Sequence, residues 1–301
     1  MDEQYLMGNN DLLKRSTSSG NEVTFISYKL RSNFIQAAIK YAFEFYSEFF
    51  ENANTYQKWD YDKLFIKYDR IYNHAISLGL FQPGGISEKD HLNFWCLSNV
   101  LSPEMYIESG VFIGSSLHSF INSPKLKKAI AIDPNLNNLR VPKTNNPSIL
   151  LINDRDFSQI NIEDSNSKTL VYFDDHINTA DRILQAYQKG LTYLLFDDST
   201  GLEGICQRLY PAIPTVPMII NCHLLNTGEK LCWTWRRGNN NIGTRVSLTI
   251  TNELIDKCYR AKNLIKKYAK LPDLGDFMPQ PYPEKTVNTS KYLLVLDNCS
   301  S

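Results

Sequence analysis

The sequence predicts an α/β protein with a Rossmann-like, doubly wound and mostly parallel sheet, preceded by an N-terminal helical extension. From about residue 105 onward, short apolar segments alternate with helical patterns. This alternation indicates a parallel sheet covered by helices on both faces. The first hundred residues are mainly helical in pattern. We therefore expect a tail and helical extension over residues 1–100 and a sheet domain over residues 101–301.

The composition narrows the class of protein. Lysine plus arginine and aspartate plus glutamate both number 32 in 301 residues, so no net charge recruits nucleic acid or an anionic membrane. The chain begins without a signal-peptide pattern, and no apolar run is long enough to span a bilayer. The six cysteines include no C-x-x-C pair, which favours free buried thiols over zinc ligands or disulfides. We expect a cytoplasmic protein that binds neither nucleic acid nor membrane.

Three helices are predicted in the extension, after a polar tail over residues 1–25. The first spans 33–51, where apolar side chains recur at helical spacing. The second spans 61–78 and ends at Gly79, a typical C-terminal cap. The third begins at Ser87, an N-cap residue with Asp90 three residues on, and ends before Pro103.

The remaining elements are read from apolar runs and the helical patterns between them. Strands are predicted at 105–107, 129–132, 148–152, 169–173, 193–196, 217–221, 231–235, 245–250 and 292–296. Helices are predicted at 116–122, 179–189, 202–209 and 252–269. Sheets of this class bind ligands beyond the carboxyl ends of their strands, so the residues after each strand carry the functional information.

The first predicted strand leads into a glycine turn bounded by Gly110 and Gly114, and then into a helix. Such a turn directs backbone N–H groups and the positive end of a helix toward one place, where an anion or a nucleoside can bind. The next strand ends at Asp133, which is placed to accept hydrogen bonds from two ribose hydroxyls. A nicotinamide or flavin fingerprint is excluded because Glu108 stands where the first glycine of G-x-G-x-x-G would be.

The segment 108–116 reads E-x-G-x-x-x-G-x-S and resembles the first motif of class I S-adenosylmethionine (SAM)-dependent methyltransferases. The resemblance implies SAM as the cofactor. In this fold the tip of the third strand approaches the adenine, so Asp154 or Asp156 could bind its amino group; a loop acid facing solvent is the alternative. An ordinary strand–turn–helix corner is the alternative for the whole segment. The implied SAM contacts are Glu108, Gly110, Gly114, Ser115, Ser116, Asp133 and Asp154.

Paired acids follow two neighbouring predicted strands. Asp174 and Asp175 come directly after one strand, and the next strand ends in Asp197 and Asp198. Four unpaired carboxylates at one sheet edge would repel and raise one another's pKa. Mg²⁺ would relieve that repulsion, because it prefers carboxylate oxygens. The alternative is that some of these acids cap the helices that follow.

The run Tyr172–Thr179, then a helix, then Leu195–Ser199 resembles the cephalosporin hydroxylase-type methyltransferases and the related macrolide and aminocoumarin sugar O-methyltransferases. The resemblance covers about residues 95–200. It implies a Rossmann-like SAM domain and a magnesium site made by Asp174 or Asp175 together with Asp197 and Asp198. It does not rank Asp174 against Asp175, because the family often has one more residue before the histidine. The family also commonly has glutamate where Asp197 stands.

The catalytic candidates lie at the tip of the fourth predicted strand. His176 is the candidate general base, with Asp175 beside it as a second catalytic residue. A purely structural role for His176, hydrogen bonded to a carboxylate, remains open. His223 is a weaker candidate base.

The expected function is SAM-dependent, Mg²⁺-assisted O-methylation of a hydroxyl on a small molecule, such as a sugar or a natural-product scaffold. Two alternatives stay open: a hydroxylase or other enzyme on the same fold, and a non-enzymatic SAM-binding or partner protein. The acceptor is not identified, because specificity lies in the unmatched N- and C-terminal regions. Whether the protein forms a homo-oligomer also remains open.

Overall fold

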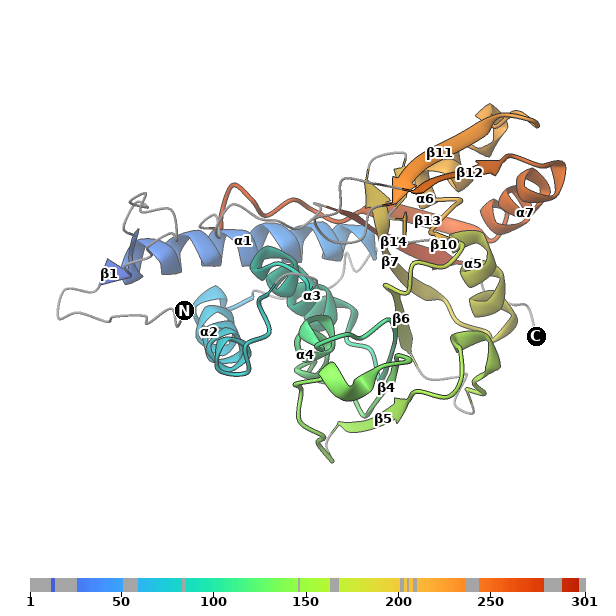
Figure 1. The fold of residues 1–301 in the computed structure, drawn as a ribbon. Helices are drawn as coiled ribbons and strands as arrows, with labels where there is room; N and C mark the ends of the chain where they lie inside the picture. Colours follow the sequence, from blue (N-terminus) through green and yellow to red (C-terminus); the bar gives the residue numbers. More distant parts are fainter. Residues whose placement is uncertain are drawn as a thin grey trace.

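The computed structural model describes residues 12–13, 26–50, 59–82, 85–145, 147–162, 168–200, 203–204, 206–207, 210–235, 244–278 and 289–297. Within these residues the main sheet has the strand order β13-β14-β7-β6-β3-β4-β5, with β8 (Glu203–Gly204) paired to the end of β7. Figure 1 shows this sheet between two groups of helices. Its layout confirms the predicted Rossmann-like architecture with a helical extension.

Five strands of the sheet are mutually parallel and supply its centre and one edge. They are β3 (Met105–Ser109), β4 (Lys128–Ile132), β5 (Ser148–Ile152), β6 (Thr169–Phe173) and β7 (Tyr193–Thr200). β14 (Ser290–Leu296) runs antiparallel to β7, and β13 (Ile265–Lys270) runs antiparallel to β14. The start of β14 therefore lies beside the carboxyl end of β7, at the edge where ligands bind in such sheets.

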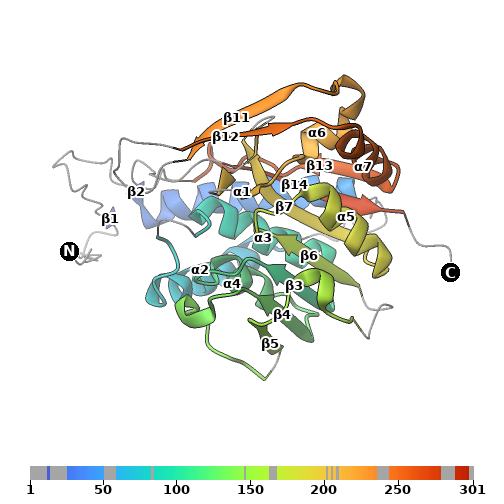
Figure 2. The ribbon, with the colours of Figure 1, turned by 45° about the vertical axis from the view of Figure 1, so that its right-hand side comes forward.

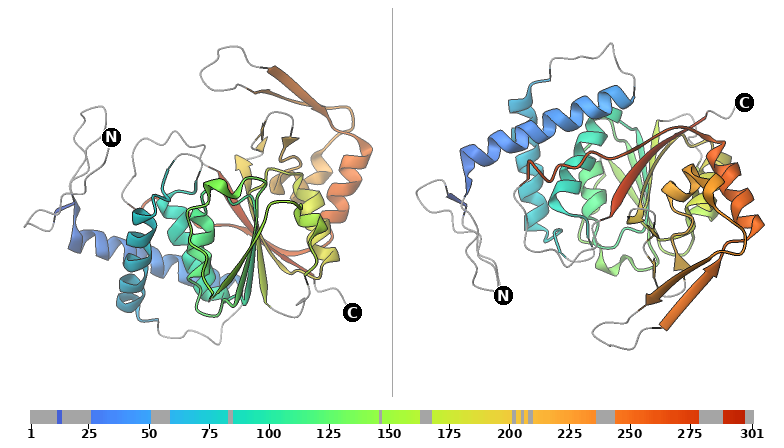
Figure 3. Two further views of the ribbon diagram at one scale, coloured as in Figure 1. Left: turned by 60° about the horizontal axis from the view of Figure 1, so that its bottom comes forward. Right: turned by 90° about the horizontal axis from the view of Figure 1, so that it is seen from above.

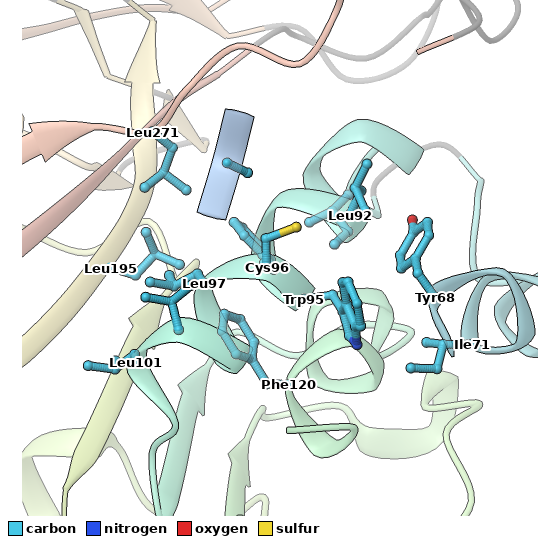
Figure 4. Packing of buried hydrophobic residues seen from close by; sticks show 14 of the residues in the cluster. Tyr68, Ile71, Leu92, Trp95, Cys96, Leu97, Leu101, Phe120, Leu195 and Leu271 are labelled. Atoms are coloured by element: carbon cyan, nitrogen blue, oxygen red, sulfur yellow. The ribbon is translucent and has the colours of Figure 1, made fainter. Parts of the chain in front are cut away.

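One face of the sheet is covered by helices from the first part of the chain. They are α1 (Tyr28–Phe49), α2 (Tyr61–Ser77), α3 (Glu88–Leu101) and α4 (Ser115–Ile121). Ser87 is the N-cap of α3, as predicted, and its side chain accepts a hydrogen bond from the Asp90 N–H. Figure 4 shows Trp95 and Cys96 of α3 packed between α2 on one side and Leu195 and Leu271 on the other. Because α1–α3 share this core with the sheet, removing them would expose it.

The opposite face is covered by α5 (Thr179–Gln188), α6 (Val216–Ile220) and α7 (Asn252–Lys262). Their apolar side chains form a second core with the alternate residues of the central strands. Figure 2 shows α5 and α7 on this side of the sheet and α2 and α4 on the other. The sheet is therefore covered on both faces, which explains why β3 and β6 are buried at every position.

Smaller elements complete the described chain. β1 (Leu12–Leu13) pairs with β2 (Ile26–Ser27), and β9 (Cys206–Gln207) pairs with β10 (Tyr210–Pro211). A hairpin of β11 (Lys230–Trp235) and β12 (Thr244–Thr249) forms a separate sheet that stands away from the main sheet in Figure 3. Short 3₁₀ turns are η2 (Leu136–Asn138), η3 (Phe157–Gln159) and η4 (Cys222–Leu224).

Three predicted elements were wrong. The strand predicted at 217–221 is helix α6, because Thr215 caps the Met218 N–H and Pro217 is favourable in a first helical turn. The helix predicted at 202–209 is replaced, in its described residues, by the short strands β8 and β9. The helix predicted at 252–269 ends at Lys262, and its second half is β13, whose burial alternates along the strand.

Among the described helices, none combines the length and apolarity needed to cross a membrane. The division into an extension over 1–100 and a domain over 101–301 stays a prediction.

Candidate functional site

The glycine turn after β3 requires both of its glycines. Gly110 has a φ of +90° and Gly114 a φ of +86°, the region where side chains are strained. A Cβ at Gly110 would lie 2.2 Å from the backbone oxygen of Asp174. A Cβ at Gly114 would lie 2.7 Å from side-chain carbons of both Leu139 and Val141. The turn is thus held tightly between the tip of β6 and the segment after β4.

Asp133, at the end of β4, holds the open side of this turn. One of its oxygens, Oδ2, accepts hydrogen bonds from the N–H groups of Val111 at 2.9 Å and Phe112 at 2.8 Å. The other, Oδ1, accepts from the Asn135 N–H at 2.7 Å. Because a carboxylate offers about four lone-pair sites, Oδ1 keeps room for one further donor. The structure therefore brings the second strand tip to the glycine turn; ribose binding by Asp133 stays a prediction.

Glu108 lies beneath the turn and is fully buried. Its carboxyl group accepts hydrogen bonds from the hydroxyls of Ser116 and, at 2.7 Å, Tyr106. Burial raises the pKa of Glu108 to about 8, against the opposing effect of these two hydrogen bonds and with a contribution from the charge of Asp133. Glu108 and Ser116 thus hold β3 and α4 together, and their predicted contact with SAM remains untested.

The other predicted cofactor residues lie in contrasting environments. Ser115 is buried, and its hydroxyl donates to the Leu80 carbonyl at 2.7 Å, which fastens the segment after α2 to the start of α4. The Asp154 side chain is 70% exposed and pairs with Arg155 at 3.4 Å. In the structure Asp154 is therefore a loop acid that faces solvent, the alternative to adenine binding.

A buried arginine holds two of the acids after strands β5 and β6. Arg182 of α5 is 1% exposed and lies 2.6 Å from Asp156 Oδ1 and 2.7 Å from Asp175 Oδ2. Hydrogen bonding to Arg182 holds the pKa of Asp156 far below its usual range. Asp175, predicted both as a catalytic residue and as a metal ligand, is thus committed to an ion pair with a cation of the protein.

The remaining residues of the fourth strand tip are Asp174 and His176. The Asp174 N–H donates to the Ser109 carbonyl at 2.9 Å, which joins β3 and β6 at their carboxyl ends. His176 has a φ of +55°, a conformation uncommon outside glycine, and it is partly exposed. His223, the weaker candidate base, lies exposed in η4 after α6. A proton-transfer role for either histidine stays a prediction.

Asp197 is 6% exposed and lies within β7, which extends to Thr200 and so beyond the strand predicted at 193–196. Its Oδ1 lies 3.1 Å from the ammonium of Lys291 and accepts from the Thr289 hydroxyl, and its Oδ2 accepts from the Tyr172 hydroxyl at 2.7 Å. Lys291 also lies 3.0 Å from Asp90 of α3. Asp198 follows in β7, and its side chain lies outside the described residues.

The described carboxylates do not fit the expected magnesium site of three acids. Asp175 and Asp197 are each held by a buried cation of the chain, Arg182 and Lys291. In the part of the chain that the structure describes, no three histidine, cysteine or acidic side chains come together as a metal site. We therefore derive no chemical step through a metal ion; magnesium ligation by Asp174 and Asp198 stays a prediction.

Sequence reasoning missed Arg182, Lys291 and Tyr172 as members of this region. Arg182 lies within a predicted helix, and Lys291 directly precedes the last predicted strand. Neither position has a sequence signal of its own. Lys291 reaches Asp197 because β14 pairs antiparallel with β7, and that pairing is not encoded in any local pattern.

Among known proteins, the chain is similar to solved structures, but it matches neither a family model nor a curated protein sequence. The chain is similar to the Mg–SAM form of cmcI, with 21% identity over 39% of this chain and 57% of that one and a TM-score of 0.29. The alignment thus spans little more than half of the cmcI chain.

Two further solved structures are methyltransferases. An O-methyltransferase from Bacillus cereus in complex with SAH is 7% identical over 84% of this chain and 99% of that one, with a TM-score of 0.37. The amino pentose methyltransferase CalS10 from Micromonospora echinaspora, with SAM bound, is 9% identical over 75% and 97%, with a TM-score of 0.35. At these values the likeness carries no argument about substrate or chemistry. From the strand order and directions described above, the chain has the Rossmann-like α/β fold that the methyltransferase resemblance implies.

Proposed function

We propose that this protein is a SAM-dependent methyltransferase that transfers the methyl group to a hydroxyl of a small molecule, such as a sugar or a natural-product scaffold. The observation that carries the proposal is the turn from Gly110 to Gly114, whose N–H groups at Val111 and Phe112 are bound by Asp133. A backbone this close to neighbouring segments leaves no room for side chains at Gly110 and Gly114. The free lone pair of Asp133 Oδ1 suits a ribose hydroxyl.

Bound SAM would supply an activated methyl group on its sulfonium. The chain would hold the nucleoside between the glycine turn and Asp133 and align the acceptor hydroxyl for in-line attack. His176, beside the tip of β6, is the proposed acceptor of the hydroxyl proton. Asp175, fixed by Arg182, would keep that tip in place rather than take the proton itself.

The test of the cofactor is calorimetric titration of the purified protein with S-adenosylhomocysteine. We expect micromolar binding that Asp133→Ala weakens by at least about tenfold, because the variant loses both the ribose acceptor and the support of the turn. Asp256→Ala, at an exposed acid of α7, is the matched control and should bind as the wild type does. Absence of binding in the wild-type protein would contradict the proposal.

Two alternatives predict different results. A hydroxylase on this fold would need oxygen and a reductant, whereas the proposed enzyme should methylate hydroxylated acceptors from SAM without either. A non-enzymatic SAM-binding or partner protein would bind S-adenosylhomocysteine and consume no SAM with any acceptor of a broad panel. Methylated product in anaerobic buffer would favour the proposal over both.

Magnesium is proposed from the resemblance alone and is tested separately. If Asp198 is a ligand, Asp198→Ala should abolish any metal-dependent activity and leave affinity for S-adenosylhomocysteine nearly unchanged. Equal loss of both would contradict this assignment.

From the balanced charge of the chain we also propose that the protein binds neither nucleic acid nor membrane.

A further inference from the structure

Lys291 is a buried lysine at the edge of the sheet where the acceptor of the proposed reaction would lie. Its side chain is 7% exposed, and it stands at the start of β14, beside the carboxyl end of β7. Its ammonium has three donors. They meet Asp90 Oδ2 at 3.0 Å, Asp197 Oδ1 at 3.1 Å and the Thr289 hydroxyl at 2.9 Å. All three donors of Lys291 therefore have acceptors within the protein.

Both oxygens of Asp197 are satisfied within the same network. Oδ1 is bound by Lys291 and by the hydroxyl of Thr289, and Oδ2 by the hydroxyl of Tyr172. The Asp197 side chain is 8% exposed, so exchange of these partners for water is restricted. The carboxylate is thus compensated in charge and hydrogen bonding by groups of the chain itself.

We infer that Lys291 takes, at Asp197, the place that the resemblance gives to a magnesium ion, and that it acts as a positioning residue which fastens α3 to the carboxyl edge of the sheet. Asp197 is then an anchor for Lys291 and not a metal ligand. The inference deepens the proposed function at the same strand tips, but its contacts involve no SAM. The two can therefore fail independently.

The ammonium of Lys291 lies beside Asp197, where a metal ion would have to bind. It is 3.1 Å from Asp197 Oδ1 and 3.0 Å from Asp90 Oδ2. A divalent ion bound to Asp197 would lie within a few ångströms of this ammonium and would be repelled by it.

The ammonium of Lys291 connects three segments of the fold. Asp90 is in the first turn of α3, Asp197 lies in the second half of β7, and Lys291 is the second residue of β14. These segments are distant in sequence and meet at one point. A metal bound by acids of β6 and β7 would join strands that the sheet already joins, whereas Lys291 also fixes a helix of the N-terminal extension.

The test compares metal binding and thermal stability in matched variants. Purified wild type, Asp197→Asn and Asp90→Asn are titrated with Mn²⁺ alone and followed by electron paramagnetic resonance. We expect Asp197→Asn to bind Mn²⁺ as the wild type does, because Asp197 is not a ligand. Asp90→Asn is the control, since it removes the other carboxylate held by Lys291. Loss of Mn²⁺ binding in folded Asp197→Asn would overturn the inference.

The second readout uses Lys291→Met, with thermal unfolding followed by circular dichroism. Removing the ammonium leaves the buried carboxylate of Asp197 and the partly buried carboxylate of Asp90 close together, so the midpoint should fall by roughly 5–10 °C. Added Mg²⁺ should raise the midpoint of this variant by more than it raises that of the wild type, because only the variant leaves Asp90 and Asp197 without a cation. An unchanged midpoint in Lys291→Met would overturn the positioning role. If Lys291→Met does not fold, Lys291→Arg should restore a folded protein because it keeps the charge, and failure of that rescue would count against the ammonium.

Discussion

Gly110 lies directly against the backbone of Asp174, so that a Cβ at Gly110 would come within 2.2 Å of the Asp174 carbonyl oxygen. The contact joins the turn after β3 to the tip of β6, and the Gly110 backbone adopts a φ of +90°. The requirement for glycine is therefore double, since both the backbone conformation and the space exclude a side chain. A substitution at Gly110 should therefore affect both the stability of the protein and the binding of the cofactor.

Gly110→Ala should destabilise the protein and abolish binding of S-adenosylhomocysteine. We expect a loss of about 3 kcal/mol or more in the free energy of unfolding, because a left-handed backbone and a backbone clash add together. Urea denaturation measures this loss. Gly228→Ala is the control, because Gly228 has a φ of +91° with nothing within 4 Å of an added Cβ. It should cost only about 1 kcal/mol, and equal losses in the two variants would contradict the close contact.

Glu108→Gln should stabilise the protein at alkaline pH. The folded pKa of Glu108 is about 8, above its ordinary value of 4.5, so between these values the unfolded state has released a proton that the folded state retains. Stability from this group is therefore full below pH 4.5 and decreases as the pH rises toward 8. The variant should match the wild type at pH 4.5 and exceed it by about 1–3 kcal/mol at pH 8.5.

Urea denaturation at the two pH values measures this difference. Glu104→Gln is the control, because Glu104 lies at the surface in an ion pair with Lys127 and should show the same small difference at both pH values. A Glu108→Gln variant that is less stable than the wild type at pH 8.5 would show that the buried group is ionised.

Three histidines form a hydrogen-bonded chain between α2, α3 and α4 that should make the protein sensitive to acid. His118 Nε2 lies 3.0 Å from His74 Nδ1, and His118 Nδ1 lies 3.0 Å from His91 Nε2. Burial, together with the charge of His74, lowers the pKa of His118 to about 4 from 6.5. As the pH falls through this window the unfolded state takes up a proton first, so stability decreases.

His118→Asn should flatten this pH dependence by removing up to about 3 kcal/mol of the change between pH 6.5 and 4. Chemical denaturation across that range measures the slope. His223→Gln changes an exposed histidine that is not one of the three hydrogen-bonded histidines, so this variant should keep the wild-type dependence of stability on pH. An unaltered slope in His118→Asn would contradict the assignment of a neutral buried imidazole.

Arg182→Met should destabilise the protein by about 3–5 kcal/mol, because it leaves Asp156 and Asp175 without their shared buried cation. Arg182→Lys keeps the charge but loses the paired guanidinium geometry, so its loss should be smaller. Urea denaturation distinguishes the two variants. If Arg182→Met is as stable as the wild type, the two acids do not depend on Arg182.

Much of the architecture could be predicted from local patterns. The strands at 148–152 and 169–173 match β5 and β6 at both ends, because each is a short apolar run rich in residues that favour strands and is bounded by polar loops. The apolar run at 217–221 shows that this pattern alone does not exclude a helix. The segment at 252–269 misled the prediction because a helix and a strand follow each other without a glycine or proline between them. The alternating burial of β13 depends on its pairing with β14, which is a tertiary contact.

The candidate site also has features that the sequence predicts and features that depend on tertiary contacts. By itself the sequence determined the glycine turn, the acid after the second strand, and the two acid pairs near the carboxyl ends of the fourth and fifth strands, because these features follow from residue type and spacing along the chain. Only the tertiary structure decided what each acid faces: Arg182 for Asp175, Lys291 for Asp197 and two hydroxyls for Glu108. The physical reason is that the protonation and binding partners of a carboxylate depend on the charges and hydrogen-bond donors within a few ångströms. These groups come from segments far away in the sequence.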